Sequence, residues 1–126
     1  MTPEVELNIR GNKVTPQISL SEGVLNIIGR SIPADSKVLY DPLLKAFYLY
    51  SLNPKDKTEI NIKLDFLNSD SNRSLMNVLI MAEKIHRRGN NVVINWHYKN
   101  NDNFMYDQGN IFKSLIEVPF CFEAEK

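Results

Sequence analysis

Apolar and polar residues alternate along the first part of the chain, and this alternation predicts β-strands. An alternation with a period of two places all the apolar side chains on one face of a strand. The apolar positions of the first run are Val5, Leu7 and Ile9. Two further strands are predicted at residues 15–20 and 23–28. They are expected to form a hairpin, because Ser21-Glu22-Gly23 at their junction includes the glycine that a short hairpin turn needs. The chain is therefore expected to begin with a β-hairpin.

An apolar stripe with a helical period follows these strands, after a loop predicted at residues 29–36. Apolar residues recur at spacings of four, four and three, which predicts one buried helix face. They are Leu39, Leu43, Phe47 and Tyr50. Asp35 or Ser36 can cap this helix, which is expected to end near Ser51. Because Pro42 lacks a backbone N–H, we expect a kink there, or a short first helix and a second one that starts at Pro42.

The strongest helical pattern in the chain covers residues 71–88. Its apolar face consists of Leu75, Val78, Leu79, Ala82 and Ile85. Basic residues followed by glycine, at Arg87-Arg88-Gly89, are typical of a helix C-terminus. Residues 58–66, before this helix, alternate regularly and predict a strand. The inward positions of that strand are expected to be Ile60, Ile62, Leu64 and Phe66.

Three weaker elements are predicted after the long helix. Residues 91–96 contain a short apolar run that is typical of a buried strand. A helix is expected from Asp102 or Asn103 to Ile116, although Gly109 disfavours it by about 1 kcal/mol relative to alanine. The packing anchors of this helix are expected to be Phe104, Ile111, Phe112 and Leu115. Residues 118–122 are predicted to form an edge strand, where a proline is tolerated.

The order of these elements predicts a single α/β domain that covers residues 1–126. A β-hairpin comes first, and helices and strands then alternate to the end of the chain. A strand, a helix and a further strand in succession form a right-handed crossover between parallel neighbours. We therefore expect a mixed sheet of about five strands with the helices packed on it.

Composition and charge argue against several classes of function. The 126 residues include 15 basic and 15 acidic side chains. This neutrality argues against nucleic acid or an anionic membrane as the main partner, since both favour a basic excess. No apolar run approaches the roughly 20 residues that span a bilayer, and the N-terminus lacks the pattern of a signal peptide. We therefore expect a cytoplasmic protein without membrane insertion.

Candidate catalytic groups are few, and no arrangement of them predicts an active site. His86 is expected to pack against its surroundings, and Cys121 to be a buried, inert thiol. His97 lies near the end of a strand, where functional residues of α/β proteins gather, but it also suits a structural role there. A single cysteine and scattered carboxylates offer no metal site. We predict a protein that is not an enzyme and that uses no metal or cofactor.

The loop before the long helix is the strongest candidate for a functional site. Its polar residues are Asn68, Ser69, Asp70 and Ser71. They stand where unpaired backbone N–H groups and the positive end of the helix dipole attract an anion. Ser71 or Asp70 is the expected cap. The residues alone leave two interpretations open: the hydroxyls of Ser69 and Ser71 serve only as caps, or one of them accepts a phosphate.

Two segments carry a more specific signature. One is Asp65-Phe66-Leu67-Asn68-Ser69-Asp70-Ser71 before the long helix, and the other is Val92-Val93-Ile94-Asn95-Trp96-His97-Tyr98. More general matches are Thr15-Pro16, Ile32-Pro33, Tyr106-Asp107-Gln108-Gly109 and Val118-Pro119-Phe120. In this order, and over nearly the whole chain, the sequence resembles the SiaC family of bacterial regulatory phosphoproteins. The resemblance implies a STAS-like fold, distantly related to anti-sigma-factor antagonists.

The resemblance also implies a non-catalytic regulator that switches partners in biofilm and cyclic di-GMP signalling. In this family a dedicated kinase phosphorylates the hydroxyl residue directly after the Leu-Asn of the loop, and a PP2C-type phosphatase removes the phosphate. By position, the implied acceptor is Ser69. The implied effector of the unphosphorylated form is a protein such as a diguanylate cyclase, which it binds and activates. The sequence departs from the family pattern at Ser69, where threonine is common, and at Asp70, where a small hydroxyl residue is common.

A partner surface is expected beside the acceptor. We predict that it includes Asn68, Asp70, Ser71, Arg73, Met76 and Ile80. Met76 and Ile80 are four residues apart, so that they either pack together against a neighbouring helix or form an exposed docking patch. The alternative function is a small-ligand-binding STAS-like module, in which Ser69, Asp70 and His97 line a pocket at the strand ends. A hydrolase or transferase is disfavoured because the sequence offers no nucleophile–base pair.

Overall fold

The computed structural model describes residues 4–126 as three helices packed on one six-stranded sheet. The strands are β1 (Leu7–Ile9), β2 (Gln17–Ser21), β3 (Val24–Ser31), β4 (Lys57–Leu67), β5 (Asn91–Lys99) and β6 (Phe120–Glu125). The helices are α1 (Ser36–Ser51), α2 (Ser69–Arg87) and α3 (Asn103–Leu115). The predicted α/β class with a mixed sheet is confirmed, and the sheet gains one strand over the expected number because the first alternating run forms the edge strand β1.

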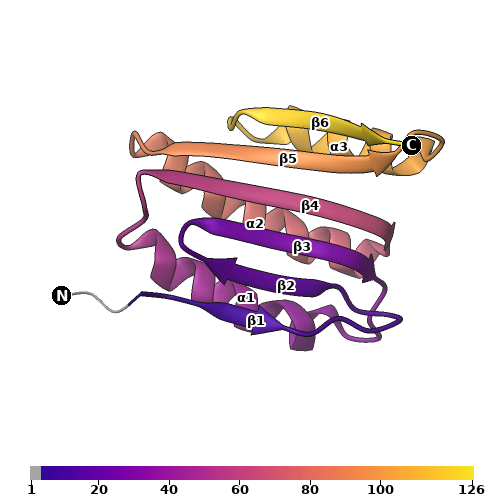
Figure 1. The fold of residues 1–126 in the computed structure, drawn as a ribbon, viewed down its shortest axis with the longest axis horizontal. Coiled ribbons are helices and arrows are strands. Elements are labelled where there is room, and N and C mark those ends of the chain that lie inside the picture. Colours follow the sequence, from indigo (N-terminus) through magenta and orange to yellow (C-terminus); the bar gives the residue numbers. More distant parts are fainter. Residues whose placement is uncertain (1–3) are drawn as a thin grey trace.

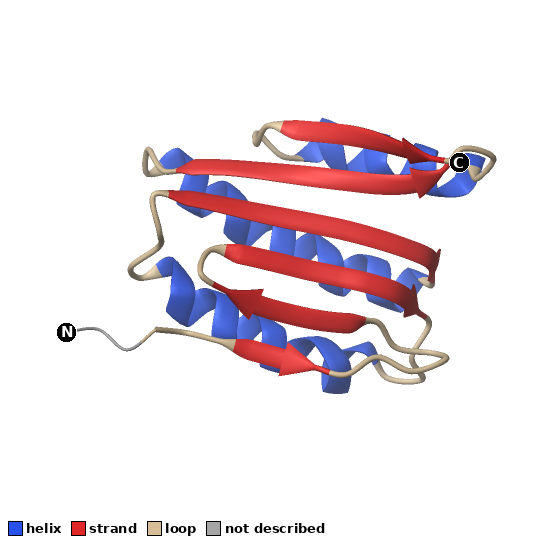
Figure 2. Cartoon of the chain, viewed as in Figure 1, coloured by secondary structure: helices blue, strands red, loops and turns tan. Residues whose placement is uncertain are grey.

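The strands lie side by side in the order of the sequence, from β1 at one edge to β6 at the other (Figure 1). The first three strands are antiparallel neighbours, and β3, β4, β5 and β6 run parallel. Each parallel connection contains one helix, and all three helices lie behind the sheet in this view (Figure 2). Crossovers of one hand that progress in one direction along a sheet place their helices on the same face. The opposite face is left open.

The core fills the space between the sheet and the helices. All the residues predicted for the inner faces of α1 and α2 are buried, which confirms both apolar stripes. The expected division into two helices at Pro42 is wrong, since α1 continues through this residue. Pro42 is exposed, so that water can replace the backbone hydrogen bond that its missing N–H forfeits.

The alternation of β4 is reversed near its end by a β-bulge. Leu64 pairs with Gly29, whereas the next residue of β3, Arg30, pairs with Phe66, which leaves Asp65 as an extra residue in β4. The prediction that Phe66 points inward is therefore wrong. Its side chain is 51% exposed, with the Arg30 guanidinium 5.0 Å from the ring centroid, and Leu67 is buried instead. The predicted loop at residues 29–36 is likewise shorter, because β3 extends to Ser31.

The open face of the sheet is polar, and a row of amides crosses it. Asn61 donates to Asn26 Oδ1 at 2.9 Å, and Asn95 donates to Asn61 Oδ1 at 2.8 Å, between residues that are register partners on neighbouring strands. Cys121 is the register partner of Asn95 on β6 and is exposed. The prediction of a buried Cys121 is therefore wrong, because β6 is an edge strand whose outward positions face solvent.

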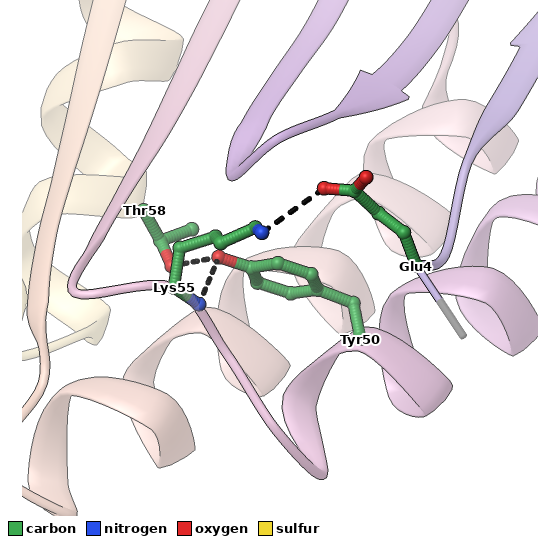
Figure 3. Close-up of polar contacts among 4 residues, drawn as sticks. All are labelled: Glu4, Tyr50, Lys55 and Thr58. Carbon is green, nitrogen blue, oxygen red and sulfur yellow. Dashed lines mark hydrogen bonds and ion pairs between the residues drawn. The ribbon is translucent and has the colours of Figure 1, made fainter. Parts of the chain in front are cut away.

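The turn between α1 and β4 is closed by the hydroxyl of Tyr50 (Figure 3). This hydroxyl shares a hydrogen bond of 2.7 Å with that of Thr58 and accepts one from Lys55 N at 3.1 Å. Lys55 Nζ also lies 3.0 Å from Glu4 Oε1. These contacts fix the end of α1 against the beginning of β4, at the end of this strand opposite to the loop that precedes α2.

A second buried tyrosine, Tyr40, is expected to make the fold less stable at alkaline pH. Its hydroxyl shares a hydrogen bond of 2.7 Å with that of Ser31. Burial raises the pKa of Tyr40 to about 12, against the opposing effect of the hydrogen bond to Ser31. An unfolded tyrosine titrates near pH 10, so the folded state holds the proton more tightly. The stability that the neutral side chain contributes is complete below about pH 10 and is lost as the pH rises toward about 12.

Replacing Tyr40 by phenylalanine is therefore expected to have opposite consequences at neutral and alkaline pH. At pH 7 the variant loses about 1–2 kcal/mol, since the Ser31 hydroxyl stays buried without its partner. When the pH rises from 8 to about 11, however, the free energy of unfolding is expected to fall by about 1.4 kcal/mol more in the wild type than in the variant. Urea unfolding monitored by Trp96 fluorescence measures both differences. Tyr48→Phe, at a side chain that is 55% exposed, is the control; an equal alkaline loss in all three proteins contradicts the prediction.

α3 packs on β5 and β6 through fewer residues than its sequence suggests. Met105, Gly109 and Phe112 are its buried residues, and Trp96 donates its indole N–H to Met105 O at 2.9 Å. Of the predicted anchors, Phe112 is confirmed. Phe104, Ile111 and Leu115 are exposed, so their assignment to the core is wrong. The exposed apolar residues of α3 each precede a buried or core-facing position by one residue and so form a second stripe beside the buried one. β5 and β6 cover only one of these two stripes.

Candidate functional site

α2 begins on the side chain of Asn68. Its Oδ1 accepts a hydrogen bond from Ser71 N at 2.9 Å, and its carbonyl accepts one from Asn72 N at 2.9 Å. The prediction that Ser71 or Asp70 caps the helix is therefore wrong, and α2 starts at Ser69 rather than at Ser71. Asparagine caps helices as well as serine and aspartate do, so that composition alone could not choose among adjacent candidates.

The same loop fastens α2 to the segment that leads from β3 into α1. Asn68 donates its backbone N–H to Ser31 O at 3.0 Å and its side-chain amide to Pro33 O at 3.2 Å. Asp70 Oδ2 accepts a hydrogen bond from Ser36 N at 3.2 Å. Two connections that are more than thirty residues apart in the sequence are thus joined at the carboxyl ends of β3 and β4. The start of α2 is held in place from the α1 side.

Asp70 has a structural role in this junction. Hydrogen bonds from the side chain and the backbone of Ser36 hold the pKa of Asp70 below its ordinary value, and the nearby cations Arg73 and Lys37 act in the same direction. The carboxylate is therefore ionised at neutral pH and is directed toward α1. This contact gives Asp70 a role in joining the start of α2 to the start of α1.

The structure separates the two serines that the sequence left equivalent. Ser69 occupies the first position of α2 and is exposed, whereas Ser71 is 0% exposed. None of the hydrogen bonds among residues 4–126 uses the backbone N–H of Ser69 or Asp70. Free donors at a helix start favour an anion. An enzyme can reach the Ser69 hydroxyl without unfolding α2, and it cannot reach that of Ser71.

One face of α2 leads from the acceptor toward the far end of the helix. Spacings of seven, four and seven return to the same side of an α-helix. The residues at these spacings are Ser69, Met76, Ile80 and Arg87. Arg87 Nη2 lies 3.9 Å from Glu117 Oε2, and Glu83 Oε2 accepts from Glu117 N at 2.6 Å. Because Glu117 follows α3 in the chain, this face of α2 borders α3.

One side of α3 is apolar and exposed. Its opposite side contacts β6: the ring of Tyr106 lies 5.5 Å from that of Phe122, and Lys113 Nζ lies 5.7 Å from the same ring. Three exposed apolar residues lie on the side of α3 away from this contact, namely Phe104, Ile111 and Leu115. Together with Ser69, Met76 and Ile80 we call them the α2–α3 surface. Met76 packs partly on the core, while Ile80 is 36% exposed.

Sequence reasoning found half of this surface. Met76 and Ile80 were expected beside the acceptor, but the contribution of α3 was missed, because its exposed apolar residues were assigned to the core. A signal was nevertheless present: α3 carries a second apolar stripe beside Met105 and Phe112, and a helix on the outer strands of a sheet buries only one. Arg73 is exposed on the same helix, whereas Asn68, Asp70 and Ser71 face the α1 junction or the interior.

The remaining candidate residues lie away from this surface. His97 Nδ1 is 3.4 Å from Glu125 Oε1 on the open face of the sheet, and α2 lies on the other face. The structure thus does not bring His97 together with Ser69 and Asp70, as a ligand pocket lined by all three requires. His86 is half-buried, as expected of a packing residue. A polar pocket at the ends of β4 and β5 is lined by Arg30, Asp65, Phe66, Lys99, Asn101, Asp102 and Asn103.

Neither a group of metal ligands nor a membrane-spanning helix is found within residues 4–126. No three of the histidine, cysteine, aspartate and glutamate side chains in this range are grouped so that they could hold a metal ion. The longest helix in the same range, α2, carries a charged face, and none of the described helices has the length and apolar character that crossing a membrane demands.

Comparisons with known proteins identify relatives along almost the whole chain. The profile of the SiaC family regulatory phosphoproteins matches residues 9–125. An uncharacterized protein of Pseudomonas aeruginosa is 26% identical over 121 residues, which are 94% of this chain and 96% of the relative. The structure of SiaC of Pseudomonas aeruginosa is 25% identical, covers 95% of this chain and 98% of its own, and superposes with a TM-score of 0.88. A crystal structure of the diguanylate cyclase SiaD in complex with its activator SiaC, from the same organism, contains a chain that is 26% identical, with 94% and 99% coverage and a TM-score of 0.89.

Proposed function

The chain belongs to the SiaC family of regulatory phosphoproteins, and from this membership we propose that it is a non-catalytic activator of a diguanylate cyclase, controlled by phosphorylation of Ser69. A kinase transfers a phosphoryl group from ATP to Ser69 Oγ in the cytoplasm, and a PP2C-type phosphatase hydrolyses the resulting ester. The observation that carries the proposal is the exposure of the Ser69 hydroxyl at the first position of α2, beside a buried Ser71.

The local structure supports a phosphate at this position without a change of fold. A phosphoserine carries about −1.5 to −2 charges at neutral pH, and the first turn of a helix stabilises negative charge. The bonds that hold the start of α2 involve Asn68 and Asp70 rather than Ser69. Modification of Ser69 therefore leaves the junction with α1 intact. A signal of this kind acts through what the surface presents and not through unfolding.

The α2–α3 surface supports binding of a protein partner. Ser69 lies on the same face of α2 as Ile80, and α3 adds three exposed apolar side chains across from it. Exposed apolar residues rimmed by charge are typical of docking surfaces. One solved relative of this fold is an activator in complex with a diguanylate cyclase. We propose an enzyme of that class as the partner that this surface binds in the unphosphorylated state.

The proposed acceptor is tested by phosphorylation in vitro. The chain is incubated with ATP and the kinase that acts on SiaC-family proteins in the same bacterium, and mass spectrometry maps the modified residue. We expect one phosphate, on Ser69, and none on Ser69→Ala. Ser71→Ala is the matched control: the Ser71 hydroxyl has no hydrogen-bond partner among the described residues, so that its removal leaves the fold unchanged. Modification of another residue, to the same extent in the wild type and in Ser69→Ala, would contradict the proposal.

A further inference from the structure

α2 presents an unpaired cation one turn after the proposed acceptor. Arg73 follows Ser69 by four residues, and side chains at this spacing are neighbours on a helix, with their Cβ atoms about 5–6 Å apart. Both residues are exposed. Within residues 4–126, no ion pair or hydrogen bond engages the Arg73 guanidinium. The other two arginines of this region are occupied, since Arg87 lies beside Glu83 and Arg88 donates to Ser51 O at 2.6 Å.

Asp70, the acidic residue in the same turn as Arg73, already has a hydrogen-bond partner on α1. Asp70 attracts Arg73 electrostatically, but its carboxylate accepts from Ser36 N and is directed toward α1. By helical periodicity, Arg73 lies between Ser69 and Asp70 around the axis of α2. The guanidinium can thus turn toward a new anion on Ser69 without breaking an existing ion pair. Its five N–H donors suit two oxygens of a phosphate at once.

We propose that Arg73 is the intramolecular receptor for a phosphate on Ser69. The guanidinium binds two phosphate oxygens and is thereby drawn toward the start of α2, away from Ile80 and the rest of the α2–α3 surface. Phosphorylation then changes this surface twice, since it adds an anion and withdraws a cation. The assignment rests on the proposed function in one respect only, namely that Ser69 is the residue that carries the phosphate.

The phosphate itself reports on this contact. Phosphoserine is incorporated at position 69 during translation, and the ³¹P resonance is titrated with pH. The second pKa of a free phosphoserine is about 6. We expect the pKa to be about half a unit lower in the wild type than in Arg73→Gln, because an exposed ion pair favours the dianion by that amount. Arg73→Lys is expected to restore part of the shift, and high salt to reduce it.

Lys84→Gln is the matched control, since Lys84 is another exposed cation of α2 but lies near its opposite end. This variant is expected to titrate like the wild type. Identical phosphate pKa values in the wild type and Arg73→Gln overturn the assignment, and so does an equal effect of Lys84→Gln, which indicates only the net charge of the helix. Because the phosphoserine is installed without a kinase, the titration is independent of the mapping experiment. A kinase that modifies another residue refutes the proposed function, whereas the titration still tests the contact between Arg73 and a phosphate on Ser69.

Discussion

A phosphate on Ser69 is expected to weaken binding of the proposed partner, a diguanylate cyclase, by about a hundredfold. Such a factor corresponds to about 2.7 kcal/mol, which is the scale of an unfavourable charge brought into an interface. The phosphate is attached at one end of the α2–α3 surface, which also contains the exposed apolar side chains of α2 and α3. A partner that covers Ile80 must therefore either desolvate the new charge or leave part of the surface uncovered.

Isothermal titration of the cyclase with the Ser69-phosphorylated and unmodified proteins measures this difference. Ser69→Glu carries one charge instead of nearly two, so that we expect a smaller loss, about tenfold. Ser21→Glu adds the same charge at the exposed last residue of β2, next to the hairpin turn, and serves as the control. Its affinity is expected to equal that of the wild type. Equal affinities of the phosphorylated and unmodified proteins refute the role of Ser69 in partner binding.

The thermal stability of these proteins separates a surface effect from unfolding. Ser69 is the first residue of α2, and an acidic side chain in the first turn of a helix is favourable. The melting temperature of Ser69→Glu is therefore expected to equal or slightly exceed that of the wild type. A substitution of Ser71 by glutamate is expected to behave differently, because it buries a charge at a position that is 0% exposed. Loss of binding without loss of stability is the result that distinguishes Ser69.

The periodicity of the sequence predicted the helices and strands well where each element buries one continuous face. The stripes of α1 and α2 follow this rule, and so does β4 as far as Leu64. The pattern failed at Phe66 because a bulge is a property of two paired strands: the shift arises where Gly29 and Arg30 meet β4. A single strand, read alone, contains no information on the residue opposite to it.

The candidate site was predictable in position and only partly in detail. A polar loop before a long apolar helix, combined with a family resemblance, located the start of α2. The choice of Asn68 as the cap depends on Pro33 and Ser31, which accept its other hydrogen bonds from more than thirty residues away in the sequence. The contact between Asp70 and Ser36 is equally distant. Such partners are fixed by the packing of α1 against α2, which no local pattern specifies.

The role of Gly109 likewise depends on residues outside its own helix, and its replacement by alanine is expected to destabilise the fold. Read alone, this glycine weakens α3, and alanine should improve the helix by about 1 kcal/mol. In the structure, however, a Cβ atom added at position 109 would lie 2.6 Å from Trp96 Cδ1 and Nε1 and 2.7 Å from Phe122 Cε1. These distances are far below van der Waals contact. The absence of a side chain at Gly109 therefore allows α3 to pack directly on Trp96 and Phe122.

We therefore expect Gly109→Ala to destabilise the protein by about 2 kcal/mol in spite of its better helix propensity. Trp96 cannot yield easily, since it is fully buried and its indole donates to Met105 O at 2.9 Å. Overpacking of such a site costs up to about 3 kcal/mol, from which the gain of about 1 kcal/mol in propensity is subtracted. Urea unfolding measures the difference. Asn110→Ala, at the exposed neighbouring position of α3, is the control and is expected to be neutral or slightly stabilising. A stabilised Gly109→Ala variant contradicts the close packing of α3 on Trp96, because propensity then outweighs the contact.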